Sequence, residues 1–168
     1  MPYWQLYYHL VWSTQDRLPM VTADAAPFVY EFIRAKVLDL EGSVFALNGL
    51  PDHVHLVAAI PPKLSVADFI GQVKGVSAAR YNKLRRPGGL VYWQEEYGAF
   101  SFDRKRLPHC VAYVEGQAQH HAENRLIPAL EHSLPPETQG VRESAPRYTA
   151  LPGEWWRELA EAVYGLDA

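Results

Sequence analysis

The stretch VFALNGLPDHVHLVAAI, residues 44–60, decides the fold of this chain. It contains two short apolar runs, 44–49 and 53–60, joined by Leu-Pro-Asp, of which Pro and Asp are typical of turns. Two such runs with so short a connection predict an antiparallel β-hairpin. The segments on either side of this hairpin must then complete a sheet around it.

Those flanking segments show further strand and helix patterns. Aromatic and β-branched residues predict strands at 3–12, 90–94 and 98–103. Apolar residues at helical spacing predict helices at 23–40, 65–84 and 107–123. The resulting order is β-α-β-β-α-β-β-α. It predicts an α+β fold, one antiparallel sheet with helices packed on a face, close to the ferredoxin-like and RNA-recognition (RRM-like) arrangements.

The length of 168 residues is that of one ordinary domain. Residues 1–123 hold all the elements predicted above and form that domain. Residues 124–168 begin with a segment rich in Pro, Ser and Gly, and a helical pattern follows at 154–164. We expect them to form a C-terminal extension packed on or near the same domain.

The composition indicates a folded protein of a reducing compartment. Hydrophobic residues make up 48% and charged residues 21%, without the polar excess of a disordered chain. A single cysteine, Cys110, excludes an internal disulfide framework and a multi-cysteine zinc site, so the cytoplasm is the expected location. No apolar run reaches the roughly 20 residues that cross a bilayer, and no signal peptide pattern is present.

The charge is unevenly distributed along the chain. A net charge of -3 argues mildly against a nucleic-acid partner. However, residues 60–106 hold nine Lys or Arg against four acids, whereas residues 111–168 hold nine acids against four Arg. Solvated helix faces explain either half equally well, so the charge alone leaves a nucleic-acid partner open.

Two imidazoles share one face of the second hairpin strand. Because side chains alternate along a strand, His53 and His55 point the same way, roughly 7 Å apart along the backbone. So placed, they can share one metal ion. A bare His-x-His also arises by chance, and histidines satisfied within a core are the plainer interpretation. Imidazoles buried on so apolar a strand would need polar partners.

The predicted helix at 107–123 has two faces. Its polar face holds Tyr113, Gln117, His120 and His121. Its opposite, apolar face holds Cys110, Val111, Val114 and Ala118. Tyr113 could be an amphipathic anchor at the edge of the core. Gly116 costs a helix interior about 1 kcal/mol relative to Ala, which is easier to understand where something approaches the helix closely.

The string PDHVHLV at 51–57 resembles the HUH motif (His, hydrophobe, His) of the single-tyrosine transposases of the smallest bacterial insertion sequences and their REP-associated relatives. Three more strings resemble the family in order: YHLVWST at 8–14, IPP at 60–62 and WQEEYGAFS at 93–101. The resemblance covers residues 3–123. It implies an HUH nuclease fold.

The resemblance also implies roles for particular residues. Tyr113 followed four residues later by Gln117 matches the tyrosine helix of the family, so Tyr113 is the implied nucleophile. Gln117 is the implied third metal ligand beside His53 and His55. This mixed nitrogen and oxygen set suits Mg²⁺ or Mn²⁺. Gly116 departs from the asparagine common at that place in the family.

The implied activity is cleavage and rejoining of single-stranded DNA at hairpin-bearing ends through a 5′-phosphotyrosine. A homodimer is implied by the resemblance alone, with the tyrosine helix acting in trans, whereas the spacing of the sequence leaves cis and trans open. Aromatic side chains at 93, 97 and 100 are available to stack on bases. The basic residues expected to contact DNA are Lys74, Arg80, Lys83, Arg85, Arg86, Arg104, Lys105 and Arg106.

Two other functions compete with this one. A histidine-triad phosphotransferase or hydrolase also begins with His-x-His on a strand, but the third alternating position here is Val57. A domesticated protein that binds hairpin DNA with little or no cleavage comes from a different class. A covalent adduct with hairpin DNA would distinguish the enzyme from the binding protein.

Overall fold

The computed structural model describes residues 2–123, and both the extension 124–168 and its predicted helix at 154–164 lie outside these residues. The strands are β1 (Tyr7–Ser13), β2 (Ser43–Leu50), β3 (His53–Ala59) and β4 (Gly98–Phe102). The α-helices are α1 (Ala26–Asp39), α2 (Val66–Lys83), α3 (Leu107–Glu115) and α4 (Gln117–Ala122). Two 3-10 turns are η1 (Gln15–Arg17) and η2 (Arg104–Arg106).

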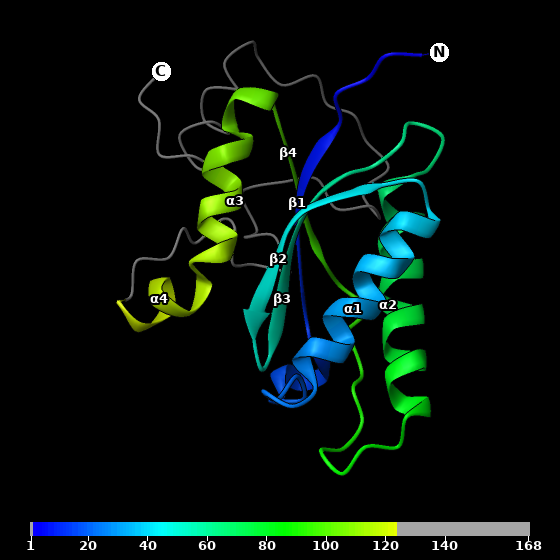
Figure 1. Cartoon of the computed structure of the whole chain (residues 1–168), viewed down its shortest axis with the longest axis vertical. Coiled ribbons are helices and arrows are strands. Elements are labelled where there is room, and N and C mark those ends of the chain that lie inside the picture. The colour runs from blue at the N-terminus through cyan, green and yellow to red at the C-terminus, as the bar shows by residue number, and fades with distance from the viewer. Residues whose placement is uncertain (1, 124–168) are drawn as a thin grey trace, which may run out of the picture.

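The four strands form one antiparallel sheet in the order β2-β3-β1-β4 (Figure 1). β2 and β3 are the predicted hairpin, with Leu50 opposite His53 next to the turn. β3 pairs with β1 along its other edge, and all seven of its residues are buried. The predicted fold class, an α+β fold with an antiparallel sheet, is confirmed.

The two faces of the sheet carry different helices (Figure 1). Val54 and Leu56 point into the larger core, which α1 and α2 cover. Val57 points the other way, into a smaller apolar cluster with α3. Because His53 and His55 alternate with Val54, they share the face of Val57. The sheet therefore presents its imidazoles to α3, away from α1 and α2.

Local signals set the helix limits. Ser65 caps α2, since its Oγ accepts a hydrogen bond from the Asp68 amide at 3.0 Å. The predicted helix at 107–123 is in two pieces, because α3 ends at Glu115 and α4 begins at Gln117, with Gly116 between them. Among residues 2–123, no helix has the length and apolar character needed to span a membrane.

The strand predicted at 90–94 is wrong. This segment makes one isolated bridge, between Thr14 and Trp93, and joins no ladder. Around that bridge the amide of Gln15 donates to the carbonyl of Tyr92 and the amide of Gln94 to the carbonyl of Ser13, both at 2.9 Å. The pairing goes no further because a side chain takes up the backbone groups of Val91. Asn82 of α2 donates to the carbonyl of Val91 at 2.9 Å and accepts from its amide at 2.8 Å. The observed order is therefore β-α-β-β-α-β-α-α.

Like Asn82, Lys74 of α2 binds the backbone of the following segment, which corrects its expected role as a DNA contact. Its side chain is 8% exposed, and Nζ donates to the carbonyls of Gln94, Glu95 and Glu96 at 2.5, 2.9 and 3.3 Å. Burial lowers the pKa of this ammonium, and the charges of Glu96 and Glu95 oppose that shift. Lys74 fixes a turn of the chain and is not available at the surface to contact DNA.

We expect Lys74→Met to lower the free energy of unfolding by about 1–3 kcal/mol, because three carbonyls lose their shared donor while the apolar stem is retained. Lys83→Met, at an exposed position of the same helix, should change it by about 0.5 kcal/mol or less. Urea unfolding followed by circular dichroism measures both. Equal losses in the two variants would show that the carbonyls at 94–96 do not depend on Lys74.

Candidate active site

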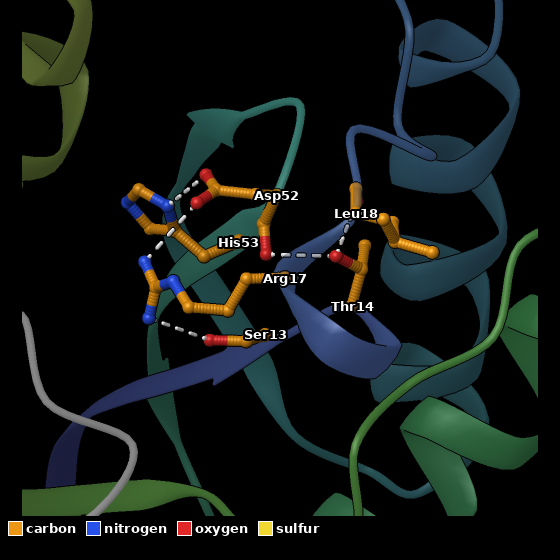
Figure 2. A network of polar contacts seen from close by, with 6 residues as sticks. All are labelled: Ser13, Thr14, Arg17, Leu18, Asp52 and His53. Carbon is orange, nitrogen blue, oxygen red and sulfur yellow. Dashed lines mark hydrogen bonds and ion pairs between the residues drawn. The ribbon is translucent and has the colours of Figure 1, made fainter.

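The first imidazole of the site, His53, is held by the residue that precedes it. Asp52 Oδ1 accepts a hydrogen bond from His53 Nδ1 at 2.7 Å, and Asp52 Oδ2 forms an ion pair with Arg17 Nη2 at 3.2 Å (Figure 2). Burial alone would raise the pKa of Asp52, but the hydrogen bond from His53 and the charge of Arg17 bring it below its ordinary value. Because a carboxylate only accepts, the proton lies on Nδ1 of His53 and the lone pair on Nε2.

Arg17 reaches Asp52 from a strained turn. Asp16 and Arg17 in η1 have φ angles of 53° and 52°, in the left-handed region that costs L residues about 1 kcal/mol or more each. From there Arg17 Nη1 also donates to Ser13 Oγ at 3.2 Å, while Thr14 Oγ1 donates to the carbonyl of Asp52 at 3.1 Å (Figure 2). The end of β1 and the hairpin turn are thus tied together beside the first imidazole.

The second imidazole, His55, is held by a histidine of β1. His9 Nε2 and His55 Nδ1 lie 2.9 Å apart, and their rings stack at 5.1 Å. When the shared proton is on His55 Nδ1, the lone pair of His55 lies on Nε2, as in His53. The rings of His53 and His55 are 5.0 Å apart. Both histidines are therefore anchored through Nδ1, so Nε2 is the nitrogen through which each ring could coordinate a cation.

α3 brings Tyr113 against these imidazoles. Its ring centroid is 6.3 Å from that of His55 and 6.2 Å from that of His9, both in edge-to-face contact. The predicted division of this helix into a polar and an apolar face is wrong. The buried stripe is Cys110, Tyr113, Val114 and Gln117, and Ala118 is exposed. The sheet face beneath α3 carries both apolar and imidazole side chains, so one helical stripe of mixed polarity packs on it.

The other residues of the predicted polar face complete the cluster. Gln117 is fully buried, and its Nε2 donates to the carbonyl of Tyr113 at 3.4 Å, so the amide oxygen is the atom with which it could bind a cation. His120 stacks on Tyr113 with ring centroids 4.9 Å apart. The ring centroid of His121 lies 5.1 Å from that of His53. The structure thus gathers the predicted nucleophile and the predicted metal-ligand histidines on one face of the sheet.

Comparison with known proteins identifies the family of this fold and site. Residues 2–117 match the family model described as Transposase IS200 like. The chain belongs to the IS200-like transposases. A transposase family implies DNA cleavage and transfer, and the predicted family is confirmed.

Individual relatives agree with this assignment. The ISDra2 transposase TnpA of Deinococcus radiodurans is 28% identical over 120 residues, which cover 68% of this chain and 85% of that protein. The transposase for insertion sequence element IS200 of Salmonella typhimurium is 25% identical over 145 residues, which cover 85% of this chain and 86% of that protein.

Two solved structures share the fold. A putative transposase from Deinococcus radiodurans R1 has a TM-score of 0.54 and 25% identity, over 74% of this chain and 95% of that one. A REP-associated tyrosine transposase bound to a REP hairpin has a TM-score of 0.53 and 13% identity, over 75% of this chain and 76% of that one. The second likeness shows the fold alone.

The donor atoms of this transposase fit a divalent cation. Among residues 2–123, no group of three or more His, Cys, Asp or Glu side chains is arranged to hold a metal ion. A cation at His53 and His55 therefore needs a third protein ligand of another type. The amide oxygen of Gln117, one helical turn after Tyr113, is of the required kind. Two anchored imidazoles and an amide oxygen form a mixed site of the sort that takes Mg²⁺ or Mn²⁺.

The basic side chains predicted to contact DNA lie in two places on this transposase. Exposed at the end of α2 and in the turn after it are Arg80, Lys83, Arg85 and Arg86. In η2, directly before α3, are Arg104, Lys105 and Arg106. Since α2 covers the opposite face of the sheet from α3, the sheet separates the first group from the imidazoles. The second group leads into the helix that carries Tyr113.

Sequence reasoning missed two residues of this cluster, His9 and Arg17, and treated Asp52 only as a flanking residue. The signal for His9 was an imidazole within the apolar strand β1, where a buried polar group needs a partner. Arg17 gave no signal, because its contact with Asp52 depends on the left-handed turn in η1.

Proposed function

We propose that this protein cleaves and rejoins single-stranded DNA at hairpin-bearing ends through a covalent 5′-phosphotyrosine intermediate. The observation that carries the proposal is the contact of Tyr113 with His55, which with His53 forms an imidazole pair whose rings are anchored through Nδ1. A hydroxyl nucleophile beside a fixed set of ligands for a cation is the arrangement that phosphoryl transfer by tyrosine needs.

His53, His55 and Gln117 would hold Mg²⁺ or Mn²⁺ through the two Nε2 atoms and the amide oxygen. When bound, such a cation stabilises the negative charge that gathers on the non-bridging oxygens of the scissile phosphate. Asp52 and His9 keep the imidazoles in the tautomer and orientation that coordination requires. Burial of the pair excludes water that would compete for these donors.

Tyr113 supplies the nucleophile. Its hydroxyl oxygen loses a proton and forms a bond to phosphorus, while the bond from phosphorus to the 3′ oxygen breaks. That oxygen leaves as a 3′-hydroxyl after taking up a proton. The phosphodiester energy is kept in the phosphotyrosine link, so a second 3′-hydroxyl can reverse the reaction and join a new strand. No nucleotide cofactor is needed.

The proposed substrate is a single strand with a neighbouring hairpin. A phosphate must come in line with a tyrosine that is 6% exposed, and unpaired strands flex into such a site more readily than duplex. The related fold of a REP-associated transposase bound to a REP hairpin supports a hairpin as the recognised feature. Phosphates would lie along the basic side chains at the end of α2 and in η2. Lys74 is not one of these contacts, because its side chain is buried.

We further propose a homodimer in which α3 of each chain serves the imidazole pair of its partner. Here α3 packs on the sheet of its own chain. Exchange of an identical element between two chains remakes the same contacts, so the packing within one chain is also a guide to the packing in trans.

The function is tested by incubating the full chain with a 3′-labelled single-stranded hairpin oligonucleotide library and Mn²⁺, because the strand joined to tyrosine keeps the 3′ end. We expect a covalent adduct that survives denaturing electrophoresis and does not form when EDTA replaces Mn²⁺. A mobility shift without an adduct would favour the hairpin-binding protein without cleavage. Nucleotide hydrolysis instead of either result would favour the histidine-triad alternative.

The anchoring of His53 can be tested by its effect on metal binding. We expect Asp52→Ala to weaken Mn²⁺ binding by about 10- to 100-fold, because His53 loses the partner that fixes its tautomer and ring orientation. Asp39→Ala, which removes an exposed carboxylate at the end of α1, should leave the affinity unchanged. Isothermal titration calorimetry without DNA measures both. Equal affinities for the two variants would contradict the role of Asp52.

A further inference from the structure

Gly116 makes room for an imidazole. A Cβ atom at this position would lie 2.9 Å from Nε2 of His120, and 3.2 Å from both Cδ2 of His120 and the carbonyl oxygen of Ala112, so the imidazole is the nearest group. The backbone does not call for glycine here, since φ is negative, at -87° with ψ at 12°, in the bridge region that residues with a side chain also occupy in turns. The glycine between α3 and α4 therefore provides space through which the His120 side chain returns across the helix.

The imidazole of His120 stacks on the ring of Tyr113. The rings of Tyr113 and His120 are 19° from parallel with centroids 4.9 Å apart, and His9 and His55 meet Tyr113 edge-on from the sheet. His120 Nδ1 is buried and has no hydrogen-bond partner within residues 2–123. Ring stacking, and not a hydrogen bond from this nitrogen, is therefore what the imidazole contributes at this place.

We infer that His120 is a positioning residue for Tyr113, which holds the phenol ring in one orientation against the imidazoles of the sheet. The inference rests on the proposed function, in which Tyr113 is the nucleophile. A ring stacked by an imidazole of α4 and held in T-shaped contact by imidazoles of the sheet has few rotamers to search before reaction. The alignment of a nucleophile strongly affects its rate. Gly116 serves the same end, because it lets His120 reach the ring.

The test compares single-turnover rates of adduct formation with Mn²⁺ and saturating hairpin DNA. We expect His120→Leu, which has a similar volume but no ring, to be about 2- to 10-fold slower, the range that an aromatic pair contributes. His120→Phe keeps a flat ring and should restore most of the rate. The affinity for DNA should be the same in all three chains.

Gly116→Ala provides a second variant that leaves His120 in place. Its methyl group would push the imidazole off Tyr113, so we expect slowing similar to that of His120→Leu. Added to His120→Leu, the same change should have little further effect, because there is no longer an imidazole to displace. Independent, multiplying effects would overturn the inference, since they would show that Gly116 acts through the helix backbone.

A measurement without DNA or metal checks the contact itself. An imidazole over the face of Tyr113 shifts its ring proton resonances upfield, and Tyr113→Phe identifies those resonances. We expect the shift to persist in His120→Phe and to disappear in His120→Leu and Gly116→Ala. Unchanged resonances in His120→Leu would overturn the inference.

The rate outcomes separate this inference from the proposed function. An adduct that forms in His120→Leu as fast as in the wild type, or faster, would overturn the positioning role alone, because the imidazole would then be idle or obstructive. No adduct in the wild-type chain would overturn the proposed function and the positioning role together, whatever the resonances show.

Discussion

Replacing Tyr113 with Phe should abolish the covalent adduct with single-stranded DNA, lowering its rate of formation by about a thousandfold or more. The change removes the nucleophilic oxygen and leaves the ring, so the contacts with His9, His55 and His120 remain. DNA binding, measured by a mobility shift in Ca²⁺ or EDTA, should stay within about twofold of wild type. Denaturing electrophoresis with labelled oligonucleotide measures the adduct.

The chain has ten tyrosines, so the site of attachment must also be mapped. Protease digestion and mass spectrometry of the wild-type adduct should place the nucleotide on the peptide that contains Tyr113. Tyr92→Phe is the matched control, because Tyr92 is about half exposed in the segment before β4. An adduct on Tyr113→Phe would remove Tyr113 as the nucleophile.

The hairpin at 44–60 could be predicted because its determinants are local. Two apolar runs and a turn at Pro51 and Asp52 fix the antiparallel pairing, and strict alternation then decides which face His53 and His55 share. The α+β class followed from the order of such segments. The alternation of side chains along β3 does not say which helix packs on that face of the sheet. The placement of Tyr113 over the imidazoles therefore came from the family resemblance and not from spacing.

The partners of the imidazoles could not be predicted because they depend on long-range register. His9 meets His55 only because β1 pairs with β3 in the register that sets Val11 opposite His55. Arg17 meets Asp52 only through two consecutive left-handed residues, which no propensity favours. Both contacts join segments more than 30 residues apart in sequence, which periodicity within one segment cannot reveal.

The wrong strand at 90–94 has a related cause. A propensity for strand describes how side chains fit a pleated surface, whereas a ladder also needs backbone groups free to pair. Here Asn82 takes up both backbone groups of Val91, and Lys74 takes up the carbonyls of residues 94–96. Hydrogen bonds from side chains to a distant backbone leave no periodic trace in the sequence.

The second large effect concerns the imidazole pair. His53→Ala alone should lower metal-dependent adduct formation by more than about 100-fold, because it removes a ligand and not merely the partner of a ligand. His53→Asn, which fills more of the buried site, should be similarly inactive if the loss is chemical. His109→Ala on α3 is the control, since His109 is exposed. Activity of His53→Ala equal to wild type would contradict the metal role.

Co-expression of the Tyr113→Phe and His53→Ala chains should then restore adduct formation that neither has alone. If α3 acts in trans, one site of each mixed dimer combines the imidazole pair of the Tyr113→Phe chain with the tyrosine of the His53→Ala chain, and the other site lacks both. Random pairing makes half of the dimers mixed, and one of the two sites in each mixed dimer is intact. About a quarter of the wild-type yield of adduct is therefore expected. A size tag should show the adduct on the His53→Ala chain. A demonstrably mixed dimer without adduct would mean that Tyr113 serves the imidazoles of its own chain, as α3 packs in this structure.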